Sequence, residues 1–192
     1  MRKSLFRLAG KGAAGFLVAL AVWFGLSTPY TRLLAALSEA AVRVTERPAV
    51  TSITPVGTLM VVDRTDFPAS PSSRQLAVES TDITFNFILL VTLFAANGRA
   101  LSDRNVFGFV GAAFALVLVH VAAVVSFVKA EAAASYGVWS AAHYGLVARH
   151  FWEAAPFFYS IIGVHGSVFA LWWLLRAPSI ASSQSASRAK HQ

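Results

Sequence analysis

The chain contains no cysteine, which excludes disulfides, thiolate metal sites, iron–sulfur clusters and cysteine nucleophiles together. Charge is also scarce, because only 13% of the 192 residues are charged whereas 56% are hydrophobic. A soluble domain carries about 25% charged residues, so this composition indicates a fold that lies mostly in lipid. Gly-rich phosphate loops, the Gly-x-Ser-x-Gly elbow and the His-Glu-x-x-His motif are also absent from the sequence. The sequence therefore carries no signature of a known active site, and we interpret it as noncatalytic.

Long apolar stretches are the main feature that is present. They lie at Gly12–Tyr30, Ile83–Ala96, Val106–Val128 and Pro156–Leu175. A helix of about 20 residues crosses roughly 30 Å of hydrocarbon. We therefore predict an all-α membrane protein with four transmembrane helices, and a small extracytoplasmic amphipathic helix and β-hairpin between the first two. The first stretch is interpreted as an uncleaved anchor, because no small-x-small cleavage pattern follows it.

The net charge of +7 is distributed unevenly along the chain. Three segments share nine bases and one acid, Asp103: the N-terminal segment, the loop after the second stretch and the C-terminal tail. The positive-inside rule then predicts that both termini are cytoplasmic and that the loops 31–82 and 129–155 lie outside. The expected location is a bacterial inner membrane, and the expected partners are the lipid bilayer and a protein, not a nucleic acid.

The region between the first two stretches has its own pattern. Residues Thr31–Arg47 show helical periodicity, with Leu33, Leu37, Ala40 and Val44 on one side and charged residues on another. The runs Thr58–Val62 and Gln75–Val78 predict the two strands of the hairpin. The chain is thus divided into 1–30, 31–82, 83–175 and 176–192, and the last segment is expected to be disordered.

Small residues line one face of each of the last two spans. They predict that these helices pack closely together. They are Gly108, Ala112, Ala115, Ala122 and Ser126 in the third span, and Gly163, Gly166, Ser167 and Ala170 in the fourth. Pro156 suits the first turn of the fourth helix.

His120 and His165 fall near the middle of the last two spans, where ionisable side chains often mark a functional site. Neutral histidine is a metal ligand, so one hypothesis is a haem or chlorophyll-type pigment with one of them as axial ligand. The alternative is a structural histidine that is hydrogen-bonded to a neighbouring helix, with no cofactor. We favour the second interpretation.

Other polar side chains are expected at the outer interface. Asp82 and Asn86 are one helical turn apart and predicted to face the same way, although Asp82 could instead cap its helix. His143 and His150 are seven residues apart on a predicted short interfacial helix that also carries Glu153. A membrane enzyme that uses Asp82, His143, His150 and Glu153 is a third hypothesis, and it requires these side chains to converge.

The order of features resembles the small membrane proteins associated with exosortases, bacterial systems that process tagged envelope proteins. The segment Ile83–Leu90 (Ile-Thr-Phe-Asn-Phe-Ile-Leu-Leu) is the part most similar to them, and the likeness covers residues 12–175 at the level of architecture. The resemblance implies a noncatalytic inner-membrane accessory or assembly subunit whose outer segment contacts a membrane or secreted partner. Exosortases themselves use a cysteine, which this chain lacks, so their activity is not carried over.

Overall fold

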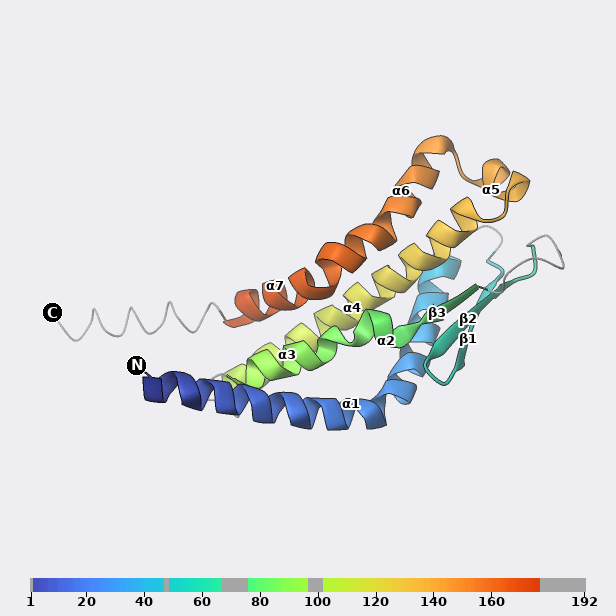
Figure 1. The fold of residues 1–192 in the computed structure, drawn as a ribbon. Helices are drawn as coiled ribbons and strands as arrows, with labels where there is room; N and C mark the ends of the chain where they lie inside the picture. The colour runs from blue at the N-terminus through green and yellow to red at the C-terminus, as the bar shows by residue number, and fades with distance from the viewer. Residues whose placement is uncertain (1, 47–48, 67–75, 97–101, 177–192) are drawn as a thin grey trace. The chain divides into compact units, whose positions relative to one another are not determined.

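The computed structural model describes residues 2–46, 49–66, 76–96 and 102–176 (Figure 1). The chain divides into two compact units. The first unit contains residues 1–23, 86–116 and 165–192, and the second contains residues 24–85 and 117–164. The predicted disordered tail lies almost entirely outside the described residues.

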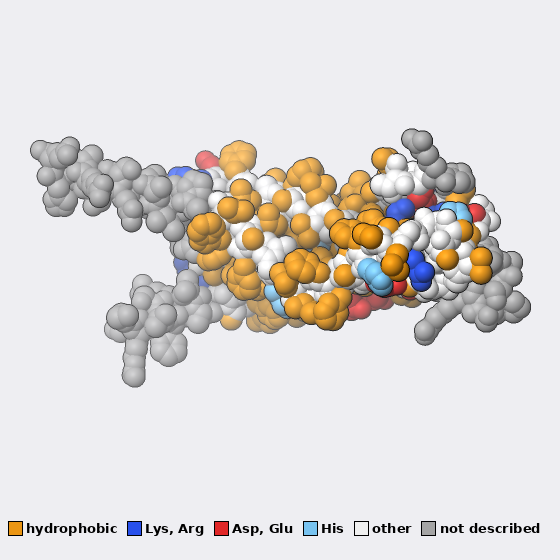
Figure 2. All heavy atoms as spheres, turned by 90° about the horizontal axis from the view of Figure 1, so that it is seen from above, with side chains coloured by type: hydrophobic (Ala, Val, Ile, Leu, Met, Phe, Trp, Pro, Cys, Tyr) orange, Lys and Arg blue, Asp and Glu red, His pale blue; other side chains and the backbone are white. Residues whose placement is uncertain are grey.

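Three helical segments are long and apolar enough to cross a membrane: Gly10–Val44, Asp103–Ala134 and Leu146–Leu175. The protein is therefore embedded in a membrane. The first segment belongs to helix α1 (Arg2–Val44), the second forms α4 (Asp103–Ala134), and the third joins α6 (Leu146–Phe158), the π-helix η1 (Tyr159–Gly163) and α7 (Val164–Arg176). Large apolar side chains are exposed along all three, and Figure 2 shows many of them on one face of the molecule.

The predicted second span is not one long helix. Its residues are divided between α2 (Ser80–Thr84) and α3 (Asn86–Ala95), with a turn at Phe85. Together Ser80–Ala95 is shorter than the about 20 residues that a crossing helix needs. The count of four transmembrane helices is therefore not confirmed.

The predicted amphipathic helix is part of α1. The apolar side identified by periodicity is exposed, since Leu33, Leu37 and Val44 are 49%, 39% and 87% exposed. The buried face is formed instead by Leu34, Ala35, Ser38 and Val42. Periodicity identified the helix correctly, but two apolar sets share this segment and the sequence does not show which one faces the core.

The β-rich segment forms three strands, β1 (Thr51–Val56), β2 (Leu59–Arg64) and β3 (Leu76–Glu79), in the order β1-β2-β3. Both pairs are antiparallel, and Met60 lies opposite Val78. The two predicted strands are confirmed as β2 and β3. The prediction missed β1, which follows Pro48 and contains Pro55, because proline is disfavoured in strands. Residues 67–75, which include Gln75 of the second predicted strand, lie outside the described part of the chain.

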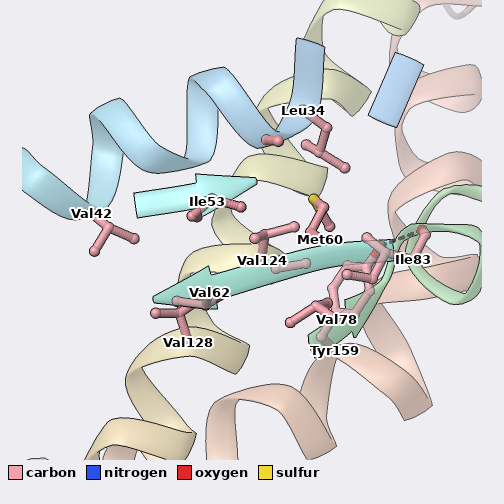
Figure 3. Close-up of a cluster of buried hydrophobic side chains, with 12 residues drawn as sticks. Leu34, Val42, Ile53, Met60, Val62, Val78, Ile83, Val124, Val128 and Tyr159 are labelled. Carbon is pink, nitrogen blue, oxygen red and sulfur yellow. Dashed lines mark hydrogen bonds between the residues drawn. The ribbon is translucent and has the colours of Figure 1, made fainter. Parts of the chain in front are cut away.

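The sheet buries one face against helices of the second unit (Figure 3). Side chains of all three strands enter this core, including Ile53, Met60 and Val78, and α1 and α4 supply Val42, Val124 and Val128. Met60 is 0% exposed, and Val124 is also fully buried. The opposite face contains the exposed Thr54, Asp63 and Ala77. The alternation of buried and exposed positions follows from the two-residue period of a strand.

Helix packing in the first unit relies on one close approach. A Cβ atom built on Gly15 of α1 would lie 2.7 Å from the Cβ of Ala95 in α3. Trp23 stacks on Phe87 at a centroid distance of 5.8 Å, and Phe109 of α4 contacts both Phe87 and Phe94 edge-on. Small and aromatic residues thus join α1, α3 and the beginning of α4.

The predicted seam between the third and fourth spans is largely wrong. Gly108 does approach Leu175, since a Cβ atom added to this glycine would lie 3.4 Å from the Leu175 carbonyl oxygen. Gly163, however, lies against the ring of Tyr159 in its own helix, and Gly166 and Ala170 are exposed. Pro156 is also inside α6 rather than at a helix start.

Candidate functional site

A buried ion network joins three elements of the second unit. Glu46, just beyond α1, forms salt bridges with Arg64 at the end of β2 and with Lys129 of α4. The exposed fractions of the three side chains are 4%, 5% and 8%. Thr51 of β1 donates a hydrogen bond of 2.6 Å from its hydroxyl to Oε2 of Glu46. One carboxylate thus connects α1, β1, β2 and α4.

Arg64 has further partners. Its Nε and Nη2 atoms each donate a hydrogen bond of 2.9 Å to the carboxylate of Asp66, and its guanidinium lies 5.3 Å from the ring centroid of Trp139. Burial acts to lower the pKa of Arg64, but the bonds and charges of Asp66 and Glu46 outweigh it and raise that pKa. Arg64 in turn lowers the pKa of Asp66. The stabilisation from this pair is complete above the ordinary pKa of an aspartate and is lost as the pH falls through the lowered value.

The network balances its charges, with two carboxylates beside two cations. Each charge is therefore compensated, and removal of one partner would leave a buried charge unpaired. The arrangement is suited to fixing the sheet on α1 and α4. Each of these ionic groups is already bonded to another.

A second pair, made of the partly buried Tyr30 and the buried His120, links α1 and α4. The hydroxyl of Tyr30 lies 2.7 Å from Nδ1 of His120, whose side chain is 0% exposed. The two rings meet edge-on at 5.9 Å. The hydrogen bond to a neighbouring helix that we expected for a structural histidine is thus present at His120. A metal at Nδ1 would have to displace the Tyr30 hydroxyl.

Hydroxyl groups extend this polar region. Thr31 of α1 and Ser80 of α2 are both buried, and their hydroxyl oxygens are 2.6 Å apart. Tyr159 of η1 donates a hydrogen bond of 2.9 Å to the carbonyl of Ile83, close to the turn that separates α2 from α3. Such bonds satisfy carbonyl groups at helix breaks within a membrane protein. The cluster therefore stabilises the turn at Phe85.

His165 has a different environment. It is exposed on α7 and makes no hydrogen bond to any residue in the described ranges. The exposed side chains near it are apolar and include Ile161, Ile162 and Phe169. The predicted hydrogen bond to a neighbouring helix is thus absent from the described chain, and the imidazole faces outward.

Asp82 and Asn86 do not share an environment. Asp82 is exposed in the first turn of α2, whereas Asn86 is 2% exposed. Asp82 does not supply the helix cap either, because the side chain of Glu79 accepts the hydrogen bond from the Thr81 N–H. The prediction that the two residues face the same way is wrong, since the helix is interrupted between them.

The outer histidines also lie apart in the secondary structure. His143 ends the short helix α5 (Val138–His143), while His150 and Glu153 belong to α6, so the single interfacial helix is not observed. His143 stacks on Trp139 at 4.2 Å, and Nδ1 of His150 lies 3.5 Å from Oε2 of Glu153. Within the described ranges, no three His, Asp or Glu side chains form a group that could hold a metal.

Sequence reasoning missed the most buried charges. Glu46 and Arg64 are separated by 18 positions and by a segment with turn residues, so periodicity does not relate them. Lys129 directly follows the uncharged run Val106–Val128 and is predicted to lie in a loop, whereas α4 continues to Ala134. The one signal in the sequence for a buried Lys129 is its position directly after the apolar run, where the helix can continue.

Replacement of Tyr30 with Phe tests the pair of Tyr30 and His120. We expect the free energy of unfolding to fall by about 1–3 kcal/mol, because His120 loses a hydrogen-bond partner in the interior. The double variant Tyr30→Phe with His120→Leu should lose less than the sum of the two single changes. Thermal and denaturant unfolding in detergent gives the free energy of unfolding of the parent protein, the two single variants and the double variant. Strict additivity of the two losses would show that the residues are not coupled.

Comparison with known proteins gives no match, since no family model, curated protein or solved structure is significantly similar to this chain.

Proposed function

We propose that the protein is a noncatalytic accessory or assembly subunit of a bacterial inner-membrane complex, and that the second unit contacts a membrane or secreted protein. The contact surface is the apolar stripe on α1 formed by Leu33, Leu37, Ala40 and Val44. The resemblance to exosortase-associated proteins suggests an exosortase-type processing system as the complex. The excess of bases in the N-terminal, second-loop and C-terminal segments supports cytoplasmic termini.

The stripe carries the proposal. Gly10–Val44 is 35 residues long, which corresponds to roughly 52 Å of helix, whereas the hydrocarbon core is about 30 Å thick. If the crossing begins near the basic residue Lys11, residues after about position 31 lie beyond the hydrocarbon. All four residues of the stripe are exposed there, and Val44 is 87% exposed.

A contiguous exposed apolar patch marks a surface that a membrane or another protein covers, and a patch beyond the hydrocarbon favours a protein. The opposite side of the same helix already packs on the sheet through Leu34 and Val42. The stripe is therefore not a core face that the fold left incomplete. A partner helix could pack its own apolar residues on it, as amphipathic helices do in grooves and coiled coils.

Photocrosslinking in the native cells tests this proposal. A photoreactive amino acid replaces Leu37 or Val44, and the matched positions are the exposed Thr45, the buried Leu34 and the exposed Phe114 of α4. We expect one protein adduct of constant mass from Leu37 and Val44, and lipid adducts from Phe114. Lipid adducts alone from Leu37 and Val44 would assign the stripe to the bilayer and would contradict the proposal.

One observation favours a second function, a tetrapyrrole-binding subunit of an electron-transfer or photosynthetic complex. The outward-facing imidazole of His165 is accessible to a pigment held between this chain and another. The accessory-subunit proposal predicts that protein purified from native cells is colourless and that His165→Gln leaves its assembly unchanged. The cofactor hypothesis predicts a visible absorption band that His165→Gln abolishes while the protein remains folded.

A further inference from the structure

The two edges of the three-stranded sheet differ in their hydrogen bonding. On β1, Ile53 donates its N–H to Oε2 of Glu39 at 2.8 Å, and the carbonyl of Thr51 accepts a hydrogen bond of 2.7 Å from Nε of Arg43. Pro55 lies two residues after Ile53, so its backbone faces the same edge, and proline has no N–H. Side chains of α1 and a proline thus close the β1 edge to strand addition.

Within the described ranges, the backbone groups along the β3 edge have no such side-chain partners. The N–H of Ser80 donates to the carbonyl of Thr58 at 2.9 Å, and this pair continues the register in which Met60 lies opposite Val78. Hydrogen-bonded and non-bonded pairs alternate along an antiparallel ladder. The N–H groups of Ala77 and Glu79 and the carbonyl of Ala77 therefore point away from β2. No described residue bonds to the backbone of Ala77 on that side.

The side chains beside this edge leave room for another strand and carry negative charge. Ala77 is exposed and has only a methyl group. From Thr51 to Phe85, the described residues include four acids, Asp63, Asp66, Glu79 and Asp82, and one base. That base is Arg64, which is buried and paired with Glu46 and Asp66. Glu79 is partly exposed and Asp82 is exposed, so the accessible charge that the described residues place next to β3 is acidic.

We propose that the β3 edge binds an extended basic segment of a partner protein, which adds a fourth strand to the sheet. The backbone of Ala77 supplies a donor and an acceptor, and the N–H of Glu79 supplies a second donor. Main-chain hydrogen bonds give affinity in this mode of recognition, and alternate side chains give specificity. This site is separate from the α1 stripe and goes beyond the proposed function.

The pleat of the sheet determines which side chains of the segment meet the acids. Ala77 and Glu79 project to the face of the sheet opposite the buried Met60 and Val78. Every second residue of an added strand would project to that same face. A segment that alternates Lys with an apolar residue therefore places a base beside Glu79 and an apolar side chain on the other face.

A fluorescent, acetylated peptide of alternating Lys and Val is the probe, and anisotropy with the full-length protein in detergent is the measurement. We expect saturable binding that weakens at least about tenfold for Ala77→Pro, which removes one donor and obstructs the edge, but not for Ala77→Ser. Asp82→Asn should weaken binding less, by about twofold to fivefold, and added salt should reduce the difference. A peptide with Glu in place of Lys should not bind.

N-methylation of the peptide distinguishes strand pairing from nonspecific charge attraction and does not depend on the fold of a variant. Only alternate N–H groups of an added strand point toward β3. Methylation of one alternate set should abolish binding, whereas methylation of the other set should preserve it. Equal effects of both sets, or no binding of the unmethylated peptide, would overturn the proposal. The photocrosslinks from Leu37 that test the α1 stripe do not depend on peptide binding at β3. The proposal for the stripe and the proposal for the β3 edge can therefore fail independently.

Discussion

The Glu46→Gln variant is expected to lose about 3 kcal/mol of its free energy of unfolding, the largest effect of a single polar change in this protein. Glutamine has nearly the same shape, so the loss is electrostatic. Glu46 is the shared partner of Arg64 and Lys129, both of which are at least nine-tenths buried. Without the carboxylate, two cations remain close together in the interior, and Asp66 pairs with only one of them.

Denaturant unfolding in detergent, followed by circular dichroism, measures this loss. The matched control is Glu153→Gln, because Glu153 is 42% exposed and its ion-pair partner among the described residues is His150; its effect should stay within about 0.5 kcal/mol. Similar small effects for both variants would show that the network contributes little to the fold. A loss confined to the second unit would be visible as a change in the environment of Trp139.

Gly15→Leu is expected to destabilise the first unit by about 3 kcal/mol, because the new side chain cannot fit against α3. Even a Cβ atom at this position would lie 2.7 Å from the Cβ of Ala95, so the two helix backbones must separate. The stacking of Trp23 on Phe87 follows from the same approach of α1 to α3. Its fluorescence should therefore change in the variant.

Gly25→Leu is the matched control, since a Cβ on Gly25 has no atom within 4 Å. It should be neutral, or stabilising by up to about 1 kcal/mol through the higher helix propensity of leucine. Thermal unfolding in one detergent compares both variants with the parent protein. Equal unfolding temperatures for Gly15→Leu and Gly25→Leu would contradict the close approach of α1 to α3.

The membrane class and most of the helices could be predicted from the sequence because they depend on local composition. Runs of uncharged residues such as Val106–Val128 need no knowledge of the fold. The predicted ends of the helices were less accurate. Lys129 and Pro156 suggested boundaries, but both lie inside helices, because tertiary packing in the second unit outweighs the local signals.

The inner face of α1 could not be predicted in this way. Leu33 and Leu37 have the same spacing as Leu34 and Ser38, and the core is built from the second set. The choice depends on the sheet, whose strand β1 was itself missed because of Pro55. A serine at position 38 in the buried face also made that face appear more polar than it is.

The candidate site depends on contacts between distant parts of the chain. His120 was singled out from its place in an apolar run, but its partner Tyr30 is 90 positions away. Glu46 and Lys129 are 83 positions apart. Spacing within one helix predicts neighbours on that helix only, so such pairs require the fold. The prediction that Asp82 and Asn86 face the same way failed because the helix breaks at Phe85, which local spacing did not reveal.

The central claim is that α1 crosses the membrane and continues beyond it with the sheet packed on its outer half. Because the chain has no native cysteine, single cysteines at Thr45, Asp63 and Phe114 can be labelled with a membrane-impermeant maleimide in intact cells. All three positions are exposed in the protein and lie outside the stripe, but only Phe114 is expected to be covered by lipid. We expect labelling of Thr45→Cys and Asp63→Cys and protection of Phe114→Cys. Protection of Thr45→Cys, or equal labelling of Phe114→Cys, would contradict the claim.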